Sequence, residues 1–260
     1  MARRRFFVDA VQSGRARITG PDAHHLTRVL RVEPGQQFEI SDNINVYLAE
    51  VESARKDLVS FVVCGTVAWT EPAVRTILLA SLIRFERFEW MLEKATELGV
   101  ARVVPVQAER SERGLEQGAE KRIARWNRIV REASEQSRRA RLPEICPPVV
   151  LATALHTDAP DHCDAFHRSD AFHRSDAFHR YVLEEAEAPP FLAALPGHRH
   201  AGDSVALLAG PEGGWTDHER EGISDAGWRP VSLGPQILRA ETAAIAALAT
   251  VNAAWMKQPD

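Results

Sequence analysis

Short apolar runs dominate the first 70 residues, and longer helical patterns follow. Apolar or alternating stretches split by turn formers predict a small β-rich region, with strands over residues 6–8, 37–40, 46–51 and 59–63. One helix is expected over residues 22–30, because Pro21 and Asp22 are typical of a helix start. We therefore expect a first domain over residues 1–70.

Strand and helix patterns alternate after Glu71-Pro72, where the residue before proline is pushed out of helical geometry. Uninterrupted apolar runs predict buried strands at residues 77–82, 102–106 and 205–209, and a shorter run predicts a strand at residues 231–233. Apolar stripes at helical spacing lie between and after them, at residues 88–98, 123–133 and 244–255. This alternation predicts an α/β domain over residues 76–260, joined to the first domain by a linker over residues 71–75.

Two glycine-bearing segments each follow an apolar run and precede a helical pattern. Residues 210–214 read Gly-Pro-Glu-Gly-Gly, and residues 233–243 read Leu-Gly-Pro-Gln-Ile-Leu-Arg-Ala-Glu-Thr-Ala. Thr216 stands three residues before Glu219, an arrangement that predicts a capped helix start. Ligands bind at the carboxyl ends of strands in open α/β sheets, which is where both segments fall. Neither segment has the glycine spacing of a Rossmann or P-loop phosphate-binding motif. Either segment taken alone is also compatible with an ordinary connection between a strand and a helix.

Together the two segments resemble the second and third signatures of the SPOUT methyltransferases. More narrowly, they are similar to the RsmE-like enzymes, which methylate N3 of a uridine in 16S ribosomal RNA. Further stretches resemble the same family, at residues 4–7, 26–31, 87–100, 105–111 and 132–145. The resemblance implies a SPOUT-type α/β parallel sheet with a C-terminal trefoil knot, and a small N-terminal PUA-like β-barrel domain that grips RNA. This chain departs from the family at Arg84-Phe85, Gln236 and Ala240, where Lys-Gly, Arg and Thr are usual.

The implied reaction needs S-adenosylmethionine as cofactor, because no side chain supplies an electrophilic methyl group. The resemblance implies that the strand and loop over residues 181–185 and both glycine segments form the cofactor site. The expected cofactor-binding residues are Leu183, Ala209, Gly210, Glu212, Gly213, Gly214, Ser232, Leu233, Gly234, Ile237 and Leu238.

Catalytic roles are expected for Arg239, Glu212 and Glu241. Uridine N3 is a poor nucleophile while protonated, so the site must stabilise its anion or remove the proton. We expect Arg239 to stabilise charge on the uracil oxygens, and Glu212 or Glu241 to accept the proton or orient Arg239. Both carboxylates also lie near predicted helix starts, where acidic side chains stabilise a helix without any catalytic role.

The formal net charge of −4 over 260 residues excludes a uniformly basic surface but not a local patch. Arginines crowd the first 31 residues and residues 122–141, and their planar fork suits phosphate. The expected RNA-binding residues are Arg4, Arg5, Arg28, Arg31, Arg84, Arg110, Arg113, Arg138 and Arg139. The resemblance implies 16S ribosomal RNA or the small ribosomal subunit as partner, and a homodimer to which the C-terminal helix contributes.

Neither a membrane span nor a metal site is indicated. No apolar stretch approaches the roughly 18 residues that a span needs, and the N-terminus lacks a signal peptide's apolar region, so a cytoplasmic protein is expected. Cys64, Cys146 and Cys163 are far apart, with no C-x-x-C.

The hexapeptide Asp-Ala-Phe-His-Arg-Ser occurs in tandem over residues 164–180, with the last copy lacking Ser. The six-residue spacing of its histidines matches no metal-ligand pattern, so an insertion by slippage is the preferred interpretation.

Two other functions stay open. One is a non-catalytic RNA-binding protein with a decayed cofactor pocket, for which the repeat and the departures from the family would be symptoms. The other is an α/β enzyme acting on small molecules, which would leave the arginine-rich N-terminal domain without a purpose.

Overall fold

The computed structural model describes residues 4–70, 72, 74–155, 178–185, 187–200 and 202–255. The chain divides into two compact units, one comprising Met1–Glu71 with Arg131–Leu142, the other Pro72–Val130 with Pro143–Asp260. The first unit thus takes in a segment from the middle of the chain. The linker over residues 71–75 stays a prediction.

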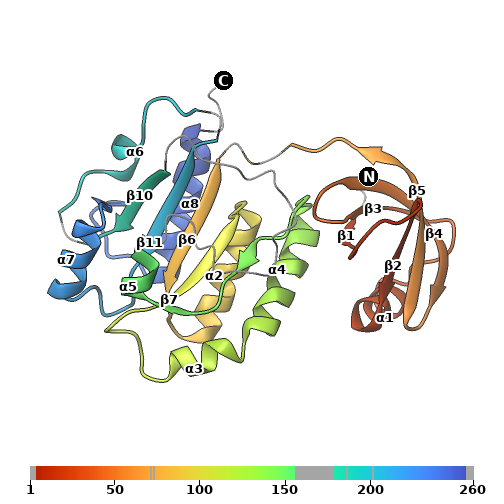
Figure 1. The fold of residues 1–260 in the computed structure, drawn as a ribbon, viewed down its shortest axis with the longest axis horizontal. Coiled ribbons are helices and arrows are strands. Elements are labelled where there is room, and N and C mark those ends of the chain that lie inside the picture. Colours follow the sequence, from red (N-terminus) through yellow and green to blue (C-terminus); the bar gives the residue numbers. More distant parts are fainter. Residues whose placement is uncertain are drawn as a thin grey trace. The chain divides into compact units, whose positions relative to one another are not determined.

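The described part of the first unit is built on a five-stranded sheet in the order β1-β3-β4-β5-β2 (Figure 1). Its strands are β1 (Arg5–Phe7), β2 (Arg15–Thr19), β3 (Gln37–Ser41), β4 (Val46–Arg55) and β5 (Leu58–Val67). β1 pairs parallel with β3, and the other pairs are antiparallel. The register of β4 against β5 shifts twice, and such irregularities bend a sheet. The predicted β-rich character of this region is confirmed.

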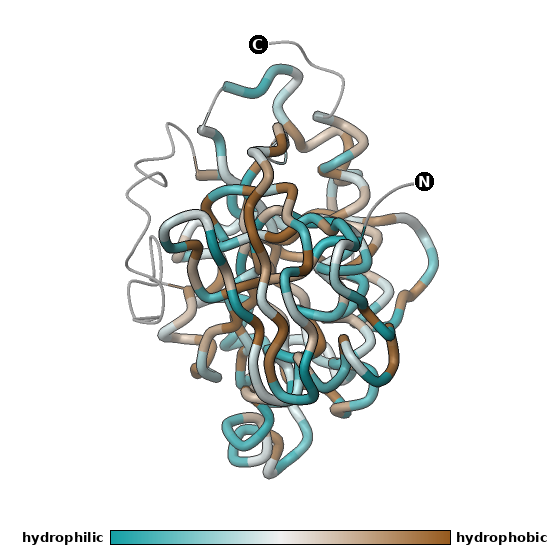
Figure 2. Tube along the Cα trace, turned by 90° about the vertical axis from the view of Figure 1, so that its right-hand side faces the viewer, coloured by the Kyte–Doolittle hydropathy of each residue, from teal (hydrophilic) through white to brown (hydrophobic). Residues whose placement is uncertain are grey.

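Alternating burial builds the core of this unit. β2 alternates between exposed and buried positions, with Ala16 and Ile18 buried. Figure 2 shows hydrophobic and hydrophilic stretches following one another along the tube. The predicted helix is α1 (Gly20–Arg28), which carries proline in its first turn and buries Ala23 and Leu26.

The second unit contains a parallel sheet, as the alternating pattern predicts. The described strands follow the order β12-β10-β11-β6-β7-β8, with β9 also pairing with β7. They are β6 (Arg75–Ser81), β7 (Arg102–Gln107), β8 (Glu144–Ile145), β9 (Val149–Val150), β10 (Phe178–Leu183), β11 (Ser204–Ala209) and β12 (Arg229–Val231). The strand predicted to begin at Val231 instead ends there, because residues 229–231 pair with residues 181–183.

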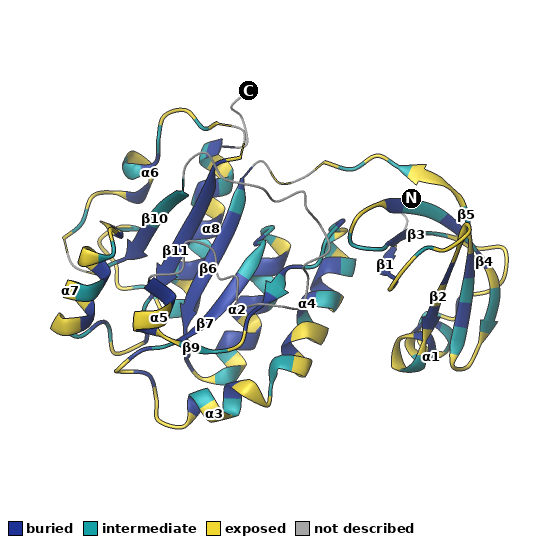
Figure 3. Ribbon diagram, viewed as in Figure 1, coloured by how far each residue is buried: buried dark blue, intermediate teal, exposed yellow. Residues whose placement is uncertain are grey.

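Helices cover both faces of this sheet, and the strands in its middle are buried on both sides (Figure 3). The helices are α2 (Phe85–Glu97), α3 (Leu115–Glu120), α4 (Ile123–Ser137), α5 (Leu151–Leu155), α6 (Phe191–Ala194), α7 (Asp217–Asp225) and α8 (Ala240–Trp255), and of α4 only the residues up to Val130 belong to this unit. Leu78 and Ala80 of β6 join a core with α2 and α8, while Ile77 and Leu79 join one with α5 and α7. The predicted trefoil knot stays a prediction.

β10 begins in the third copy of the hexapeptide, because Phe178, His179 and Arg180 are its first three residues. They pair with residues 204–206 of β11, and Arg180 donates from Nη1 to the carbonyl of Ala226 at 3.4 Å. The first two copies lie outside the described residues. The end of the repeat is therefore part of the sheet.

No helix in the described part of the chain is long and apolar enough to cross a membrane. Within the same residues, no three His, Cys, Asp or Glu side chains gather where they would hold a metal ion. Cys64 and Cys146 are free thiols, and Cys163 lies outside the described residues.

Candidate active site

A cavity of about 340 Å³ lies at the carboxyl ends of β10, β11 and β12, the edge at which ligands bind in open α/β sheets. Two connections form much of its wall. We call residues 210–215, which follow β11, the first glycine loop, and residues 232–239, which follow β12, the second glycine loop. The lining residues are 183–185, 210–212, 214–215, 233–234 and 236–240, with Arg87, Arg220 and Ala243.

The first glycine loop requires its glycines. A Cβ on Gly210 would lie 3.1 Å from the indole of Trp215, which is buried, so the backbone can approach that ring only without a side chain. Gly214 has a φ of +67°, a conformation that other residues rarely adopt. Gly213 lies against Arg110, where a Cβ would come within 3.1 Å of the arginine's own Cβ.

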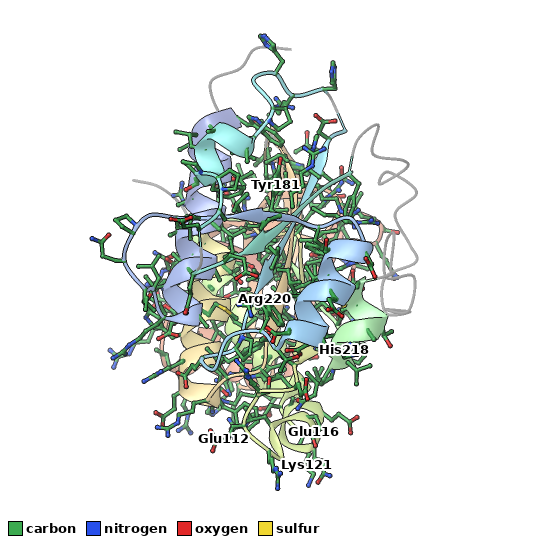
Figure 4. The ribbon with its side chains drawn as sticks, turned by 90° about the vertical axis from the view of Figure 1, so that its left-hand side faces the viewer. Glu112, Glu116, Lys121, Tyr181, His218 and Arg220 are labelled. Carbon is green, nitrogen blue, oxygen red and sulfur yellow. The ribbon has the colours of Figure 1, made fainter. Side chains whose placement is uncertain are left out.

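Arginine side chains hold this loop through its carbonyl groups. Arg110 donates from Nη1 to the carbonyls of Gly213 at 3.0 Å and Trp215 at 3.4 Å. Arg220, which Figure 4 labels on α7, donates from Nη1 to the Trp215 carbonyl at 2.7 Å and from Nη2 to Glu184 at 3.2 Å. The loop is therefore connected both to the segment after β7 and to the end of β10.

The predicted capped start of α7 is confirmed. The hydroxyl of Thr216 accepts from the backbone N–H of Glu219, and the Glu219 side chain accepts from the N–H of Thr216. Glu219 also accepts from the N–H of Glu109 at 2.7 Å, and the Thr216 hydroxyl donates to the Glu109 carboxylate at 2.8 Å. Such a cap satisfies helix N–H groups that otherwise lack partners.

The second glycine loop is held by its own backbone and by the segment before α6. Ser232 donates its N–H to the carbonyl of Pro189 at 2.9 Å, and its hydroxyl accepts from the N–H of Gly234 at 3.2 Å. Gly234 has a φ of +131°, so a substitution there would strain the backbone. Ile237 lines the cavity and is 78% exposed, so its apolar side chain is accessible there. The end of this loop thus offers apolar surface to a ligand.

The charges in the cavity divide into paired and unpaired groups. Arg87, from the first turn of α2, forms an ion pair with Glu212, and its Nε lies 3.9 Å from Glu241 Oε1. Arg239 and Glu185 line the cavity as well, and neither has an ion pair within the described residues. A cation and a carboxylate are therefore available to a ligand.

The predicted cofactor residues converge on this cavity. Those that line it are Leu183, Gly210, Glu212, Gly214, Leu233, Gly234, Ile237 and Leu238. The other three contribute backbone beside it: Ala209 ends β11, Gly213 accepts from Arg110, and Ser232 begins the second glycine loop. Of the predicted catalytic residues, Arg239 and Glu212 line the cavity, while Glu241 is buried next to it.

The predicted RNA-binding arginines of the first unit differ in exposure. Arg4, Arg28 and Arg31 are exposed, and so is Arg138. Arg5 is buried, and its guanidinium pairs with Glu39. Donors of Arg5 are therefore engaged within this unit, and its RNA-binding role stays a prediction.

Arg139 also belongs to the first unit. Its side chain is partly exposed, and burial lowers the pKa of its guanidinium to about 10. In the second unit Arg84, Arg110 and Arg113 are exposed, and Arg84 lies 3.8 Å from Glu112.

Sequence reasoning missed Arg87, Trp215 and Arg220 as residues of the cavity, whereas Glu184 and Glu185 belong to the stretch that the resemblance had already assigned to its wall. The signal for Arg87 lies in its position. α2 starts only four residues after β6 ends, so its first turn must lie at the carboxyl edge of the sheet.

Phe85, which replaces the family's usual glycine, leaves the cavity intact. Its ring packs near Trp126, with centroids 6.2 Å apart, and the Arg122 guanidinium lies 4.2 Å above it. Gly118 makes room for the ring, because a Cβ there would come within 2.8 Å of it. The other two departures, Gln236 and Ala240, do line the cavity.

The cavity fits S-adenosylmethionine. Its volume falls within the range of roughly 300–1,000 Å³ that is usual for small-molecule and cofactor sites. Cβ atoms on Gly214 and Gly234 would meet nothing within 4 Å, so ligand atoms can approach this backbone. The buried indole Nε1 of Trp215 has no hydrogen-bond partner within the described chain. Leu183, Ile237 and Leu238 suit an adenine ring, and the carboxylates suit the cofactor's cationic groups.

Comparison with known families gives two matches along the chain. A model described as an RNA methyltransferase domain matches residues 70–252, and a model of an RNA methyltransferase PUA domain matches residues 18–64. The ribosomal RNA small subunit methyltransferase E of Bacillus subtilis (strain 168) is 30% identical over 242 residues, 90% of this chain and 88% of that protein. The protein of the same name from Mycobacterium bovis is 31% identical over 265 residues, covering 95% and 90%.

Solved structures agree with this comparison. The chain resembles a ribosomal RNA small subunit methyltransferase E from Neisseria gonorrhoeae bound to S-adenosyl methionine, with 28% identity, 98% of each chain covered and a TM-score of 0.80. It resembles a putative methyltransferase from Legionella pneumophila in complex with the same cofactor, at 28% identity, 98% coverage of each chain and a TM-score of 0.82. The predicted parallel α/β sheet with an N-terminal PUA-like domain is confirmed.

Proposed function

Because the chain belongs to the ribosomal RNA small subunit methyltransferase E family of RNA methyltransferases, we propose that it methylates N3 of a uridine in 16S ribosomal RNA with S-adenosylmethionine as methyl donor. The observation that carries this proposal is the cavity at the carboxyl edge of the parallel sheet, where both glycine loops meet. Arg239, a cation with no ion pair in the described chain, lines it.

S-adenosylmethionine supplies the electrophilic methyl group when it is bound. The protein's part is to bind and orient it. We assign this role to Leu183, to the glycines of the first glycine loop, and to the backbone of Leu233, Ile237 and Leu238. Ala209, Glu212 and Ser232 complete the proposed wall. The glycines permit close approach of the backbone, and the apolar side chains exclude water from the adenine.

Arg239 is the proposed catalytic residue. Loss of the N3 proton leaves negative charge on the uracil ring and its oxygens, and a guanidinium held in place stabilises such charge. Of the two candidate carboxylates, Glu212 is the one that can meet the substrate, because its side chain is 44% exposed while that of Glu241 is 7% exposed. We therefore assign proton acceptance to Glu212 and an orienting role to Glu241.

RNA contact is proposed for the exposed arginines of both units. In the first unit these are Arg4, Arg28, Arg31 and Arg138, and in the second Arg84, Arg110 and Arg113. Arginine–phosphate contacts supply most of the sequence-independent affinity of such proteins. The substrate is 16S ribosomal RNA, free or in the small subunit, and its place in the cell makes the cytoplasm the proposed location.

A homodimer is part of this proposal. α8 is apolar nearly all round, and its less buried positions carry small residues such as Ala243, Ala246, Ala249 and Ala253. A helix that is apolar on every side is suited to burial on every side. We accordingly assign the outward face of α8 to the interface between two copies. Sedimentation of the full chain would give a dimer mass.

The decayed-pocket alternative is less favoured. Phe85 packs on Gly118 and Trp126 and does not line the cavity, so this departure does not fill it. Ala240 is small, and Gln236 can bond polar groups of a ligand.

The test is a methylation reaction with unmodified small ribosomal subunits, methyl-labelled S-adenosylmethionine and the full chain. Digestion of the 16S ribosomal RNA to nucleosides and mass spectrometry should reveal labelled 3-methyluridine. Addition of S-adenosylhomocysteine, which competes for the cavity, should suppress it. Cofactor binding without any labelled nucleoside would overturn the assigned reaction, and absence of both would favour the non-catalytic alternative.

A further inference from the structure

Arg87 is placed differently from the other cavity cations. It comes from the first turn of α2, while the carboxylates it meets come from the two glycine loops or their ends. Glu212 lies in the first glycine loop, and Glu241 is the second residue of α8, two residues after Arg239. In the described part of the chain, Arg87 is the one side chain that pairs both with a carboxylate of the first glycine loop and with a carboxylate at the start of α8, directly after the second glycine loop.

Glu241 gives this link its importance. Its side chain is 7% exposed, Oε1 lies 3.9 Å from Arg87 Nε, and Oε2 has no hydrogen-bond partner within the described residues. A buried carboxylate that loses its cation is strongly unfavourable, because water cannot replace the lost partner. The pair with Arg87 therefore stabilises the start of α8 in its position beside the cavity, in addition to the packing of the helix in the core.

Within the described residues, no other hydrogen bond or ion pair joins one glycine loop to the other. Arg110 and Arg220 bind carbonyls of the first glycine loop, and Arg220 also binds Glu184 just after β10, but neither donates to the second glycine loop. Ser232 connects the second glycine loop to Pro189 and to its own residue Gly234. The planar guanidinium of Arg87 can serve two acceptors at once, which an ammonium on a flexible stem does less well.

We propose that Arg87 is a positioning residue that fixes the two glycine loops to each other through Glu212 and Glu241. Arg87 acts on the cofactor and on Arg239 indirectly, because it holds in place the two glycine loops that carry the ligand-binding groups. Arg239 is close to this link along the chain, and its carbonyl accepts from the N–H of Ala243 at 2.8 Å in the first turn of α8. The identity of the ligand rests on the function proposed above, but the link between the loops does not.

The same helix offers a matched control. Glu89, also on α2 and also buried, is bound by Arg122 at 2.8 Å and by Arg125. None of these three residues lines the cavity. Arg122→Ala therefore removes an arginine from a buried carboxylate of α2 without touching either glycine loop.

Hydrogen exchange of the full chain without cofactor tests the link directly. Arg87→Ala should raise the exchange rates of peptides covering both glycine loops by about ten-fold or more, the effect expected when a buried pair is broken. Arg122→Ala should leave those peptides unchanged. Acceleration in one loop only, or in neither, would overturn the proposal.

Calorimetry with S-adenosylhomocysteine measures the consequence for the cavity. Arg87→Ala should raise the dissociation constant about ten-fold or more, and Arg87→Lys should raise it less. Adding Glu241→Gln to Arg87→Ala should recover part of the affinity, because no unpaired buried carboxylate then remains. Equal weakening by Arg122→Ala would show a general loss of stability and contradict the assignment.

Two safeguards keep the outcomes distinct. If Arg87→Ala does not fold, Glu212→Gln tests the same link from the exposed side and should accelerate exchange in the first glycine loop. If the wild-type protein binds no S-adenosylhomocysteine, the proposed function fails, while exchange in the cofactor-free protein still decides the role of Arg87.

Discussion

Arg239 in the second unit and Arg5 in the first are both arginines of a predicted site, but their surroundings are opposite. Arg5 is buried, donates to Glu39 from Nε at 3.1 Å and Nη2 at 2.8 Å, and donates to the carbonyl of Arg138. Arg239 is exposed beside the cavity, and its guanidinium has no partner in the described chain. A guanidinium whose donors are already bound holds the fold, whereas one with free donors is available to a ligand.

If Arg239 is available to the substrate, replacing it should give the largest effect of the predictions here, and that effect should be on activity. Arg239→Ala should lower kcat for methyl transfer by about 10²–10³-fold, the usual effect of removing one preorganised donor from a developing charge. The dissociation constant for S-adenosylhomocysteine and the melting temperature should stay near wild type. Arg239→Lys keeps the positive charge but not the planar guanidinium, so its kcat should lie between those of the wild type and Arg239→Ala. Loss of cofactor affinity equal to the loss in kcat would assign Arg239 to cofactor binding instead.

Arg5→Ala should have the opposite profile. Removing one member of a mostly buried ion pair leaves Glu39 without its partner, and the free energy of unfolding of the first unit should fall by about 2–4 kcal/mol. Urea unfolding measures this change, with Arg4→Ala as the exposed neighbour that should change it by less than about 0.5 kcal/mol. Unchanged stability together with weakened RNA binding would return Arg5 to the RNA-binding set.

The elements were largely predictable because local rules decide them. The capping box at Thr216 and Glu219 and the buried run over residues 205–209 both have a local physical cause, and both are confirmed. β12 was misplaced by two residues because strand pairing with residues 181–183 outweighs the apolar character of Leu233, which turns to the cavity.

The site was predictable only where a motif carried it. The glycines and Arg239 lie in short segments that a family resemblance identifies. Arg5 was not separable from Arg4 in an arginine run, because its burial depends on Glu39, 34 residues away in the chain. The pairing of Arg87 with Glu212 was unpredictable for the same reason, since Glu212 lies 125 residues from it. Pairing between distant residues leaves no periodic or local signal in a sequence.

Glu135 extends the comparison to a carboxylate of the first unit. Burial raises its pKa to about 7, although Arg131 at 3.7 Å opposes this. The folded state therefore binds a proton more tightly than the unfolded chain, and stability should fall as pH rises from about 4.5 to 7, by roughly 1–3 kcal/mol. Glu135→Gln should flatten this profile in urea unfolding at several pH values. Exposed Glu132→Gln is the control, and an unchanged slope in Glu135→Gln would contradict the assignment.

Arg28 and Arg31 of the first unit resemble Arg239 in being exposed with no partner in the described chain. Each substitution to Ala should weaken binding of a 16S ribosomal RNA fragment several-fold and lower the slope of log affinity against log salt by about one. Fluorescence anisotropy at several salt concentrations measures both. Arg15→Ala is the control, because Arg15 already pairs with Glu52 at 2.9 Å. If all three substitutions weaken RNA binding equally, an ion-pair partner does not distinguish arginines that bind RNA from arginines that do not.

The hexapeptide supplies the smallest expected effect. Arg180, in the third copy, resembles Arg5 in that its guanidinium is bonded within the fold, because it donates to the backbone carbonyl of Ala226 from a paired strand. Its counterparts Arg168 and Arg174 lie outside the described residues. If the first two copies are only an insertion, deleting residues 164–175 should change the free energy of unfolding by less than about 1 kcal/mol, because halving a connection alters its closure entropy by roughly 0.6 kcal/mol. S-adenosylhomocysteine binding should persist, since Leu183 and the paired end of β10 are untouched. A larger loss in either measurement would show that the earlier copies make contacts that the sheet or the cavity needs.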